Sequence, residues 1–354
     1  MQHKKLAALV LGMMAVLLAA ACSSDPTATA APTQSSGPAP TPTVERLSMK
    51  YGLLSFVSTE WGPFVAQSEG FYDRAGLDVE FVFTGGFGDL NTLLLAGEVD
   101  AILGAFTTPM LGRPQGQPVK LISAGHNTRE DYNNWYAALP NSGIETLADV
   151  RGKTVNMFAE GSFAWTIAHT YLDSNGLLDD VDLVGLPFQE AYSGLVTGRS
   201  DVGIFIEPFF SLANEASIAE FGKPLNVIWT FEDAMGMDDI VLATPSLAME
   251  NTIATKTEEL QRFVTATINA QYWGWKEENR PRVREIIAEW TNTDVAVINK
   301  AKLAPGSLNG RFPAGQLQKT QQLLNQAGSL TTPPLPDEDL FDMRFVRNLE
   351  LVNP

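Results

Sequence analysis

Residues 71–106 read FYDRAGLDVEFVFTGGFGDLNTLLLAGEVDAILGAF, and residues 171–206 read YLDSNGLLDDVDLVGLPFQEAYSGLVTGRSDVGIFI. The second stretch repeats the plan of the first. In both, a helix stops at a glycine (Gly76, Gly176), a strand begins, and a second helix ends in Gly-x-x-Asp before another strand. This repetition predicts two lobes built on one βα plan, with a cleft between them that can hold a small molecule.

Hydrophobic patterns extend this plan along the chain. The strands that they predict are residues 47–54, 77–83, 100–106, 120–125, 154–158, 181–186 and 201–206. The helices that they predict are residues 61–73, 89–97, 161–172, 191–197, 258–275, 280–290, 294–301 and 315–328. Strands that alternate with helices indicate right-handed crossovers, so the expected class is α/β with a mostly parallel sheet in each lobe.

The N-terminus has the pattern of a secretory signal peptide at residues 1–21. A basic head at residues 3–5 precedes an apolar run, residues 6–18, and then three alanines lead to Cys22. A cysteine after small residues resembles a bacterial lipobox, which implies lipidation at Cys22; an ordinary signal peptide cut after Ala21 is the alternative. Residues 22–45 are rich in Ser, Thr, Ala and Pro and are expected to form a disordered tether. The expected location is the cell membrane, with the protein lipid-anchored and facing outside the cytoplasm.

Composition excludes several functions. The chain has 24 Lys and Arg against 41 Asp and Glu, a formal net charge of −17, and this acidity argues against nucleic acid as a partner. No Ser-His-Asp arrangement and no His/Cys spacing for zinc occurs in the sequence, so no catalytic residue, metal or cofactor is expected. A monomer is expected.

Several motifs resemble those of type II periplasmic binding proteins, and more narrowly the group that binds alkanesulfonates, taurine, nitrate, thiamine pyrimidines and riboflavin. The motifs are WGPFVAQSEGFY at residues 61–72, GLDV at 76–79, LAGEVDA at 95–101, LADVRGKTV at 147–155 and DVGIFIEP at 201–208. The resemblance covers residues 47–275. It implies a two-lobed fold with a central ligand cleft, made of lobe 1 (46–127 and the helical 239–354) and lobe 2 (128–238). It also implies a solute-binding protein that is no enzyme and that hands its ligand to the permease and ATPase of an ABC importer.

In open α/β sheets, ligands bind beyond the carboxyl ends of strands, and this rule selects the candidate site. The loops there supply aromatic and acidic side chains but no Lys or Arg. The candidates are Phe56, Glu60, Trp61, Gly86, Phe87, Phe106, Thr107, Glu160, Ser162, Phe163, Glu190, Tyr192 and Glu207. A planar, uncharged heterocycle fits them best, with riboflavin favoured and the thiamine pyrimidine precursor next, and an alkanesulfonate, taurine or nitrate as the alternative. Trp61 is expected to stack on the ligand, and Glu190 or Glu207 to hydrogen-bond it.

Other interpretations remain open for some of these residues and for the protein. Phe56 and Phe106 could plug the core at strand ends, and Glu207 could belong to a hinge turn. A eukaryotic relative of this fold is a pyrimidine-precursor synthesising enzyme that consumes its own histidine; structural roles are favoured here for His126 and His169, so an enzyme is disfavoured. An extracellular sensor would have the same fold as a transport protein.

Overall fold

A computed structural model describes residues 46–54, 59, 61–129, 131–158, 162–347 and 349. The expected signal peptide, the tether and Cys22 lie outside these residues. So do three of the candidate site residues, Phe56, Glu60 and Glu160. Residues 44–354 form one compact unit.

A five-stranded mixed sheet forms the first part of the fold, in the order β2-β1-β3-β12-β4. Its strands are β1 (Leu47–Leu54), β2 (Leu77–Thr84), β3 (Ala101–Leu103), β4 (Val119–Ser123) and β12 (Ser246–Met249). β1 pairs in parallel with β2 along its whole length and with β3, whereas β12 runs antiparallel to β3 and β4. A strand from late in the chain is thus inserted between two early ones.

A second group of strands lies between β5 and β11 in the sequence. These strands are β6 (Trp135–Ala138), β7 (Thr154–Asn156), β8 (Asp182–Val184), β9 (Gly203–Phe205) and β10 (Asn226–Thr230). β7 and β8 pair in parallel, and an isolated parallel bridge joins Val155 to Val202. β6 is antiparallel to both β9 and β10. The α/β class is confirmed, but the expectation of a mostly parallel sheet is wrong for β10-β6-β9. Because β6 arrives directly from β5 rather than through a crossover helix, it can run antiparallel to its neighbours.

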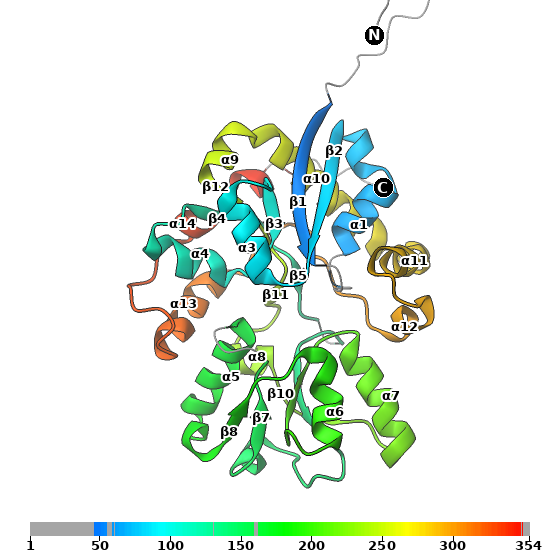
Figure 1. Ribbon diagram of the computed structural model, residues 1–354, viewed down its shortest axis with the longest axis vertical. Helices are drawn as coiled ribbons and strands as arrows, with labels where there is room; N and C mark the ends of the chain where they lie inside the picture. Colours follow the sequence, from blue (N-terminus) through cyan, green and yellow to red (C-terminus); the bar gives the residue numbers. More distant parts are fainter. Residues whose placement is uncertain are drawn as a thin grey trace, which may run out of the picture. The chain divides into compact units, whose positions relative to one another are not determined.

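Two short strands connect these parts. β5 (His126–Asn127) and β11 (Val241–Ala243) pair antiparallel, and Figure 1 shows both between the five-stranded sheet and the group with β7, β8 and β10. Gln316, fully buried, holds Val241 through both of its backbone groups, at 2.8 and 2.7 Å. We call β5 and β11 the connecting strands. The lobe boundaries at residues 127/128 and 238/239 stay a prediction.

Helices flank both groups of strands (Figure 1). Those before the connecting strand β5 are α1 (Trp61–Ser68), α2 (Phe71–Arg74), α3 (Phe87–Ala96) and α4 (Thr107–Gly112). Those between the connecting strands are α5 (Phe163–Ser174), α6 (Ala191–Val196), α7 (Phe209–Phe221) and α8 (Phe231–Met235). Those of the C-terminal third are α9 (Glu250–Thr255), α10 (Thr257–Trp275), α11 (Arg280–Thr291), α12 (Val295–Lys300), α13 (Gln316–Gln326), α14 (Asp337–Leu340) and α15 (Arg344–Arg347). Among the described helices, none combines the length and apolar character that a membrane span requires.

Two of the differences between predicted and observed helices have a clear local cause. The helix expected over residues 61–73 is split, because Gly70 adopts a left-handed conformation with φ 71° between α1 and α2. The helix expected to begin at Asp89 begins at Phe87, and its N-cap is Gly86, so Asp89 lies in the first turn rather than at the cap.

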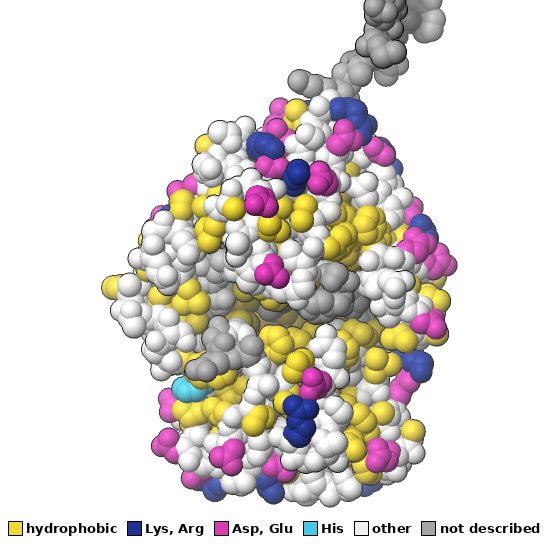
Figure 2. All heavy atoms as spheres, in the orientation of Figure 1, with side chains coloured by type: hydrophobic (Ala, Val, Ile, Leu, Met, Phe, Trp, Pro, Cys, Tyr) yellow, Lys and Arg dark blue, Asp and Glu magenta, His cyan; other side chains and the backbone are white. Residues whose placement is uncertain are grey.

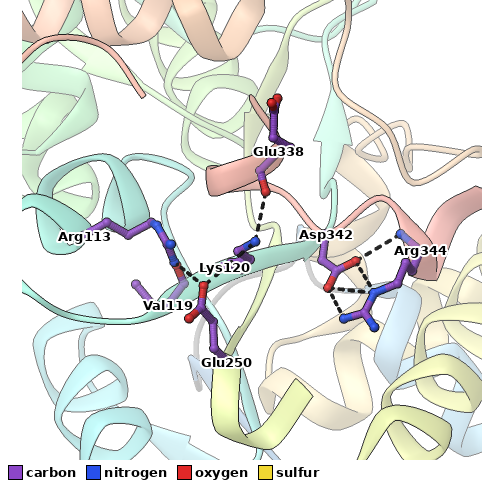
Figure 3. A network of polar contacts seen from close by, with 7 residues as sticks. All are labelled: Arg113, Val119, Lys120, Glu250, Glu338, Asp342 and Arg344. Atoms are coloured by element: carbon purple, nitrogen blue, oxygen red, sulfur yellow. Dashed lines mark hydrogen bonds and ion pairs between the residues drawn. The ribbon is translucent and has the colours of Figure 1, made fainter. Parts of the chain in front are cut away.

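The C-terminal segment packs on the free edge of the five-stranded sheet at β4. Phe341 forms a parallel bridge with Leu121, and the Asp342 amide donates to the Leu121 carbonyl at 2.9 Å. Figure 3 shows Lys120 directed at the Glu338 carbonyl, 2.9 Å away, while Arg113 binds the Glu250 carboxylate at 2.8 Å. These contacts cover an edge that would otherwise expose unpaired backbone groups.

Candidate functional site

Aromatic rings from both parts of the fold meet where strands end. Phe106 follows β3, and Phe163 begins α5 after β7. Their ring centroids lie 4.4 Å apart in an edge-to-face arrangement. Phe312 lies 6.0 Å from Phe106, and Phe231 lies 5.7 Å from Phe163. Figure 2 shows hydrophobic side chains bordering a transverse hollow between the part with β1–β4 and the part with β6–β10. We call Phe106, Phe163, Phe231 and Phe312 the central aromatic cluster.

Local backbone features fix the two predicted members of this cluster. Ser162 is the N-cap of α5, and its hydroxyl oxygen accepts a hydrogen bond from the Trp165 amide at 3.1 Å. The next residue, Phe163, is therefore held in the first turn of the helix. Thr107, which is buried, begins α4 directly after Phe106. The structure thus brings together Phe106, Thr107, Ser162 and Phe163, as expected for residues beyond the carboxyl ends of strands.

A second ring contact lies beyond the carboxyl ends of β7 and β8, the same end of β7 that leads to Phe163. Phe158 and Phe188 stack with ring centroids 4.1 Å apart and an interplanar angle of 9°. The strand-end rule applied to the sequence selects the loop that carries Phe188, whereas Phe158 was not a candidate. Phe158 was missed because the predicted strand, residues 154–158, ran two residues too far; β7 ends at Asn156, so Phe158 lies beyond the strand end. Gly86 and Phe87 lie at the start of α3, after β2, and the Phe87 side chain is 39% exposed.

Trp61 does not face an open surface. The residue is 1% exposed, and its indole N–H donates to the Ala304 carbonyl at 2.8 Å. Gly274 of α10 lies so close to the indole that a Cβ there would be 2.6 Å from Trp61 Cζ3. The structure makes Trp61 a packing residue between α1 and α10, and this contradicts the expectation that it stacks on the ligand.

Two polar candidates have protein partners at the surface. Glu190 forms an ion pair with Arg199 at 2.7 Å, with both side chains about half exposed. The Tyr192 hydroxyl donates to Glu220 at 3.2 Å, and burial together with this bond raises the pKa of Tyr192. The polar groups of Glu190 and Tyr192 are therefore already bonded to protein side chains, Glu190 to Arg199 beyond the end of α6 and Tyr192 to Glu220 of α7.

Glu207 is a buried carboxylate, 2% exposed, that follows β9. It accepts a hydrogen bond from the Ser211 hydroxyl at 2.8 Å. Burial raises the pKa of Glu207, an effect that the bonds from Ser211 and the charge of Lys302 partly offset. Glu207 is therefore tied to the start of the helix that follows it, and its burial contradicts the solvated carboxylate that the hinge-turn interpretation assumes.

His126 is buried in the connecting strand β5, where its Nδ1 lies 2.9 Å from the Thr244 hydroxyl. Burial lowers the pKa of His126 to about 3, so the ring is neutral near pH 7. Among the described residues, no group of three or more His, Cys, Asp or Glu side chains is arranged to hold a metal ion.

A hollow with a volume of about 600 Å³ lies away from the central aromatic cluster. It lies at the amino ends of β1 and β2, at the sheet edge opposite to the central aromatic cluster. Its charged side chains are mostly paired with one another, as Asp100 is with Lys256 at 2.8 Å. Because the carboxyl ends of strands are the usual ligand edge, we assign the candidate site to the aromatic cluster.

Known proteins with the same fold include periplasmic binding proteins. The aliphatic sulphonate binding protein SsuA from Escherichia coli aligns with a TM-score of 0.66 at 16% identity, over 84% of this chain and 98% of that one. The riboflavin-binding protein RibY of Chloroflexus aurantiacus is 26% identical over 278 residues, 75% of this chain and 73% of the relative. A 4-amino-5-hydroxymethyl-2-methylpyrimidine phosphate synthase of Schizosaccharomyces pombe is 29% identical over 97 residues, 27% of each chain.

The family match covers most of both sheet regions. Residues 59–276 match the protein family described as NMT1/THI5 like. This range begins just before α1 and ends just after α10, so it includes Phe106, Phe163 and the connecting strands. The chain belongs to the NMT1/THI5-like family, and its fold is that of the periplasmic binding proteins.

Proposed function

We propose that this protein is the substrate-binding component of an ABC importer and that it captures a planar heterocyclic vitamin or precursor, with riboflavin favoured. The observation that carries the proposal is the edge-to-face contact of the half-buried Phe163 with the buried Phe106, which brings aromatic rings from both parts of the fold to one place and leaves part of Phe163 open. Aromatic faces bind flat rings by stacking, each worth about 1–3 kcal/mol. The riboflavin-binding relative adds support for the ligand.

The charges at the site favour a neutral ligand over an anion. Of the candidate positions that the structure describes, none is Lys or Arg, and the cation nearest in sequence to Glu190, Arg199, is neutralised by it. An anion would need donors such as the backbone amides at the start of α5. Sulfonate or nitrate is therefore the second candidate, which the fold likeness to SsuA keeps in view.

Delivery and location complete the proposal. Lipidation at Cys22 would anchor the protein outside the cytoplasm, within reach of the permease. Labelling of cells with a radioactive fatty acid checks the anchor: the wild-type protein is expected to incorporate label, and the Cys22→Ala variant is not. An enzymatic role in making the pyrimidine precursor is disfavoured, because the single histidine found near the connecting strands, His126, is buried and bound to Thr244.

A titration tests the ligand. Protein purified without denaturant is examined by native mass spectrometry for a co-purifying compound, and is then titrated with riboflavin while flavin fluorescence is followed. The pyrimidine precursor, taurine and nitrate are titrated separately by calorimetry. Quenching with a dissociation constant near micromolar, about −8 kcal/mol, is expected for riboflavin. Binding of taurine or nitrate without binding of riboflavin would refute the proposed ligand.

A further inference from the structure

The stacked pair Phe158–Phe188 differs in burial from the stacks that lie in the packed interior. In the stacks Tyr136–Trp229 and Trp135–Phe210 all four residues are buried, so their rings are part of the packed interior. Phe158 and Phe188 are both only half-buried, yet their rings are nearly parallel, with ring centroids 4.1 Å apart. Phe158 and Phe188 pack against the hydrophobic core on one side and keep part of their apolar area open to solvent on the other, where a second ring can be placed.

The backbone that holds Phe158 is strained. Its φ of 66° lies in the left-handed region, which a phenylalanine rarely adopts. Such conformations persist only where the surroundings enforce them, and they concentrate at binding sites. Two neighbours enforce this one. The Asn156 side-chain oxygen accepts from the amides of Phe158 at 3.0 Å and Leu186 at 2.8 Å. Gly185 allows the close approach, since a Cβ there would be 2.5 Å from the Phe158 carbonyl oxygen.

Asn156 has a further feature. The residue is fully buried, and its Nδ2 group has no hydrogen-bond partner in the described part of the chain. An unpaired buried donor costs stability, so its presence at the carboxyl ends of β7 and β8 is not explained by folding alone. Asn156 thus joins the segments that follow β7 and β8 through its side-chain oxygen, while its Nδ2 group has no partner among the described residues.

From this geometry we infer that Phe158 and Phe188 form a preorganised stacking platform that recognises the ring system of the ligand. Asn156 is its positioning residue. The inference rests on the proposed function, because it assigns the platform to the strand ends from which that function was argued, Phe158 and Phe163 both following β7. It narrows the ligand class to planar aromatic heterocycles, since saturated sulfonates and nitrate offer no ring large enough to cover a phenyl face.

Four variants of the full chain test the platform. Phe188→Leu and Phe158→Leu remove a ring while keeping apolar volume, Phe188→Tyr keeps the ring, and Phe221→Leu is the matched control, a half-buried phenylalanine at the end of α7. Riboflavin affinity is measured by fluorescence quenching, and folding by thermal melting. We expect the two Leu substitutions at the platform to weaken binding roughly 5- to 150-fold, the Tyr variant to bind within about threefold of wild type, and Phe221→Leu to be unchanged.

The outcomes separate the platform from the proposed function. If the wild-type protein binds riboflavin and both platform Leu variants bind it within about threefold of wild type, the platform is overturned and the proposed function is not. If Phe188→Tyr loses as much affinity as Phe188→Leu, the platform is also overturned, because the loss of the ring would then not be the cause. This comparison remains valid even if Phe188→Leu lowers the melting temperature. A wild-type protein that binds no planar ring, neither riboflavin nor the pyrimidine precursor, would refute the proposed function and remove the basis of the platform.

Discussion

Replacing Trp61 by Phe is expected to destabilise the protein without weakening ligand binding. The change removes the indole N–H that donates to the Ala304 carbonyl at 2.8 Å, and Ala304 is 2% exposed. A buried carbonyl left without a donor costs about 1–3 kcal/mol. The smaller ring also leaves unfilled space beside Gly274, worth about 1 kcal/mol more. The free energy of unfolding should therefore fall by about 2–4 kcal/mol.

Urea denaturation followed by tryptophan fluorescence and circular dichroism measures this loss, and a riboflavin titration measures affinity. Trp290→Phe is the matched control. Its indole N–H donates to the exposed Ser68 hydroxyl at 2.9 Å, and water can replace that donor at little cost. A Trp61→Phe variant no less stable than Trp290→Phe would refute the packing role. Unchanged stability together with a tenfold loss of affinity would restore the earlier expectation that Trp61 stacks on the ligand.

Two pH predictions follow from buried groups. Burial lowers the pKa of His126 from 6.5 to about 3, so between these pH values the unfolded chain binds more protons than the folded one. The free energy of unfolding should therefore fall as pH drops from 6.5 towards 3, by up to about 1.4 kcal/mol per pH unit. Urea denaturation of His126→Gln should lose this pH dependence, and that of His169→Gln should keep it. Burial raises the pKa of Glu207 above 4.5, so its contribution is fully present below pH 4.5 and is lost as pH rises through the folded value. Glu207→Gln should be at least as stable as wild type at pH 7, measured by urea denaturation; lower stability there would indicate that the carboxylate's bond to Ser211 outweighs its burial.

Local sequence patterns predicted many of the elements because local chemistry sets them, but they missed α4, α7, β6, β10 and β12. The alternating run at residues 47–54 is strand β1 with the same bounds, and Ser162 caps the helix that it was expected to open. The split at Gly70 was missed because one glycine inside a helical pattern is often tolerated, and only its φ of 71° shows the break. The antiparallel pairing of β6 was missed because pairing direction depends on contacts between distant segments.

The positions of the candidate residues follow from where strands stop, but their orientations do not. The rule that ligands lie beyond strand ends selected Phe106 and Phe163, and their rings are in contact; a ligand role for them stays a prediction, and the 1% exposure of Phe106 agrees with the alternative that it plugs the core. Trp61 satisfies the same rule, but its indole binds a carbonyl 243 positions later, at Ala304, and no local pattern carries that information. Phe312 joins the cluster from a segment between helices that has no periodic pattern.

The ring contact between Phe106 and Phe163 also sets a condition on the ligand. An aromatic pair of this kind contributes about 0.5–1.5 kcal/mol beyond the area it buries, and it joins the two parts of the fold without any ligand. A ligand favours this joined arrangement only through contacts that it makes better there than in a separated one. A ring that inserted between Phe106 and Phe163 would forfeit their contact, whereas a ring that stacked on the half-buried Phe158–Phe188 pair would leave that contact intact. The second geometry adds stacking energy to a contact that already exists, and for that reason the platform, rather than the buried Phe106 ring, is where the ligand's ring system should lie.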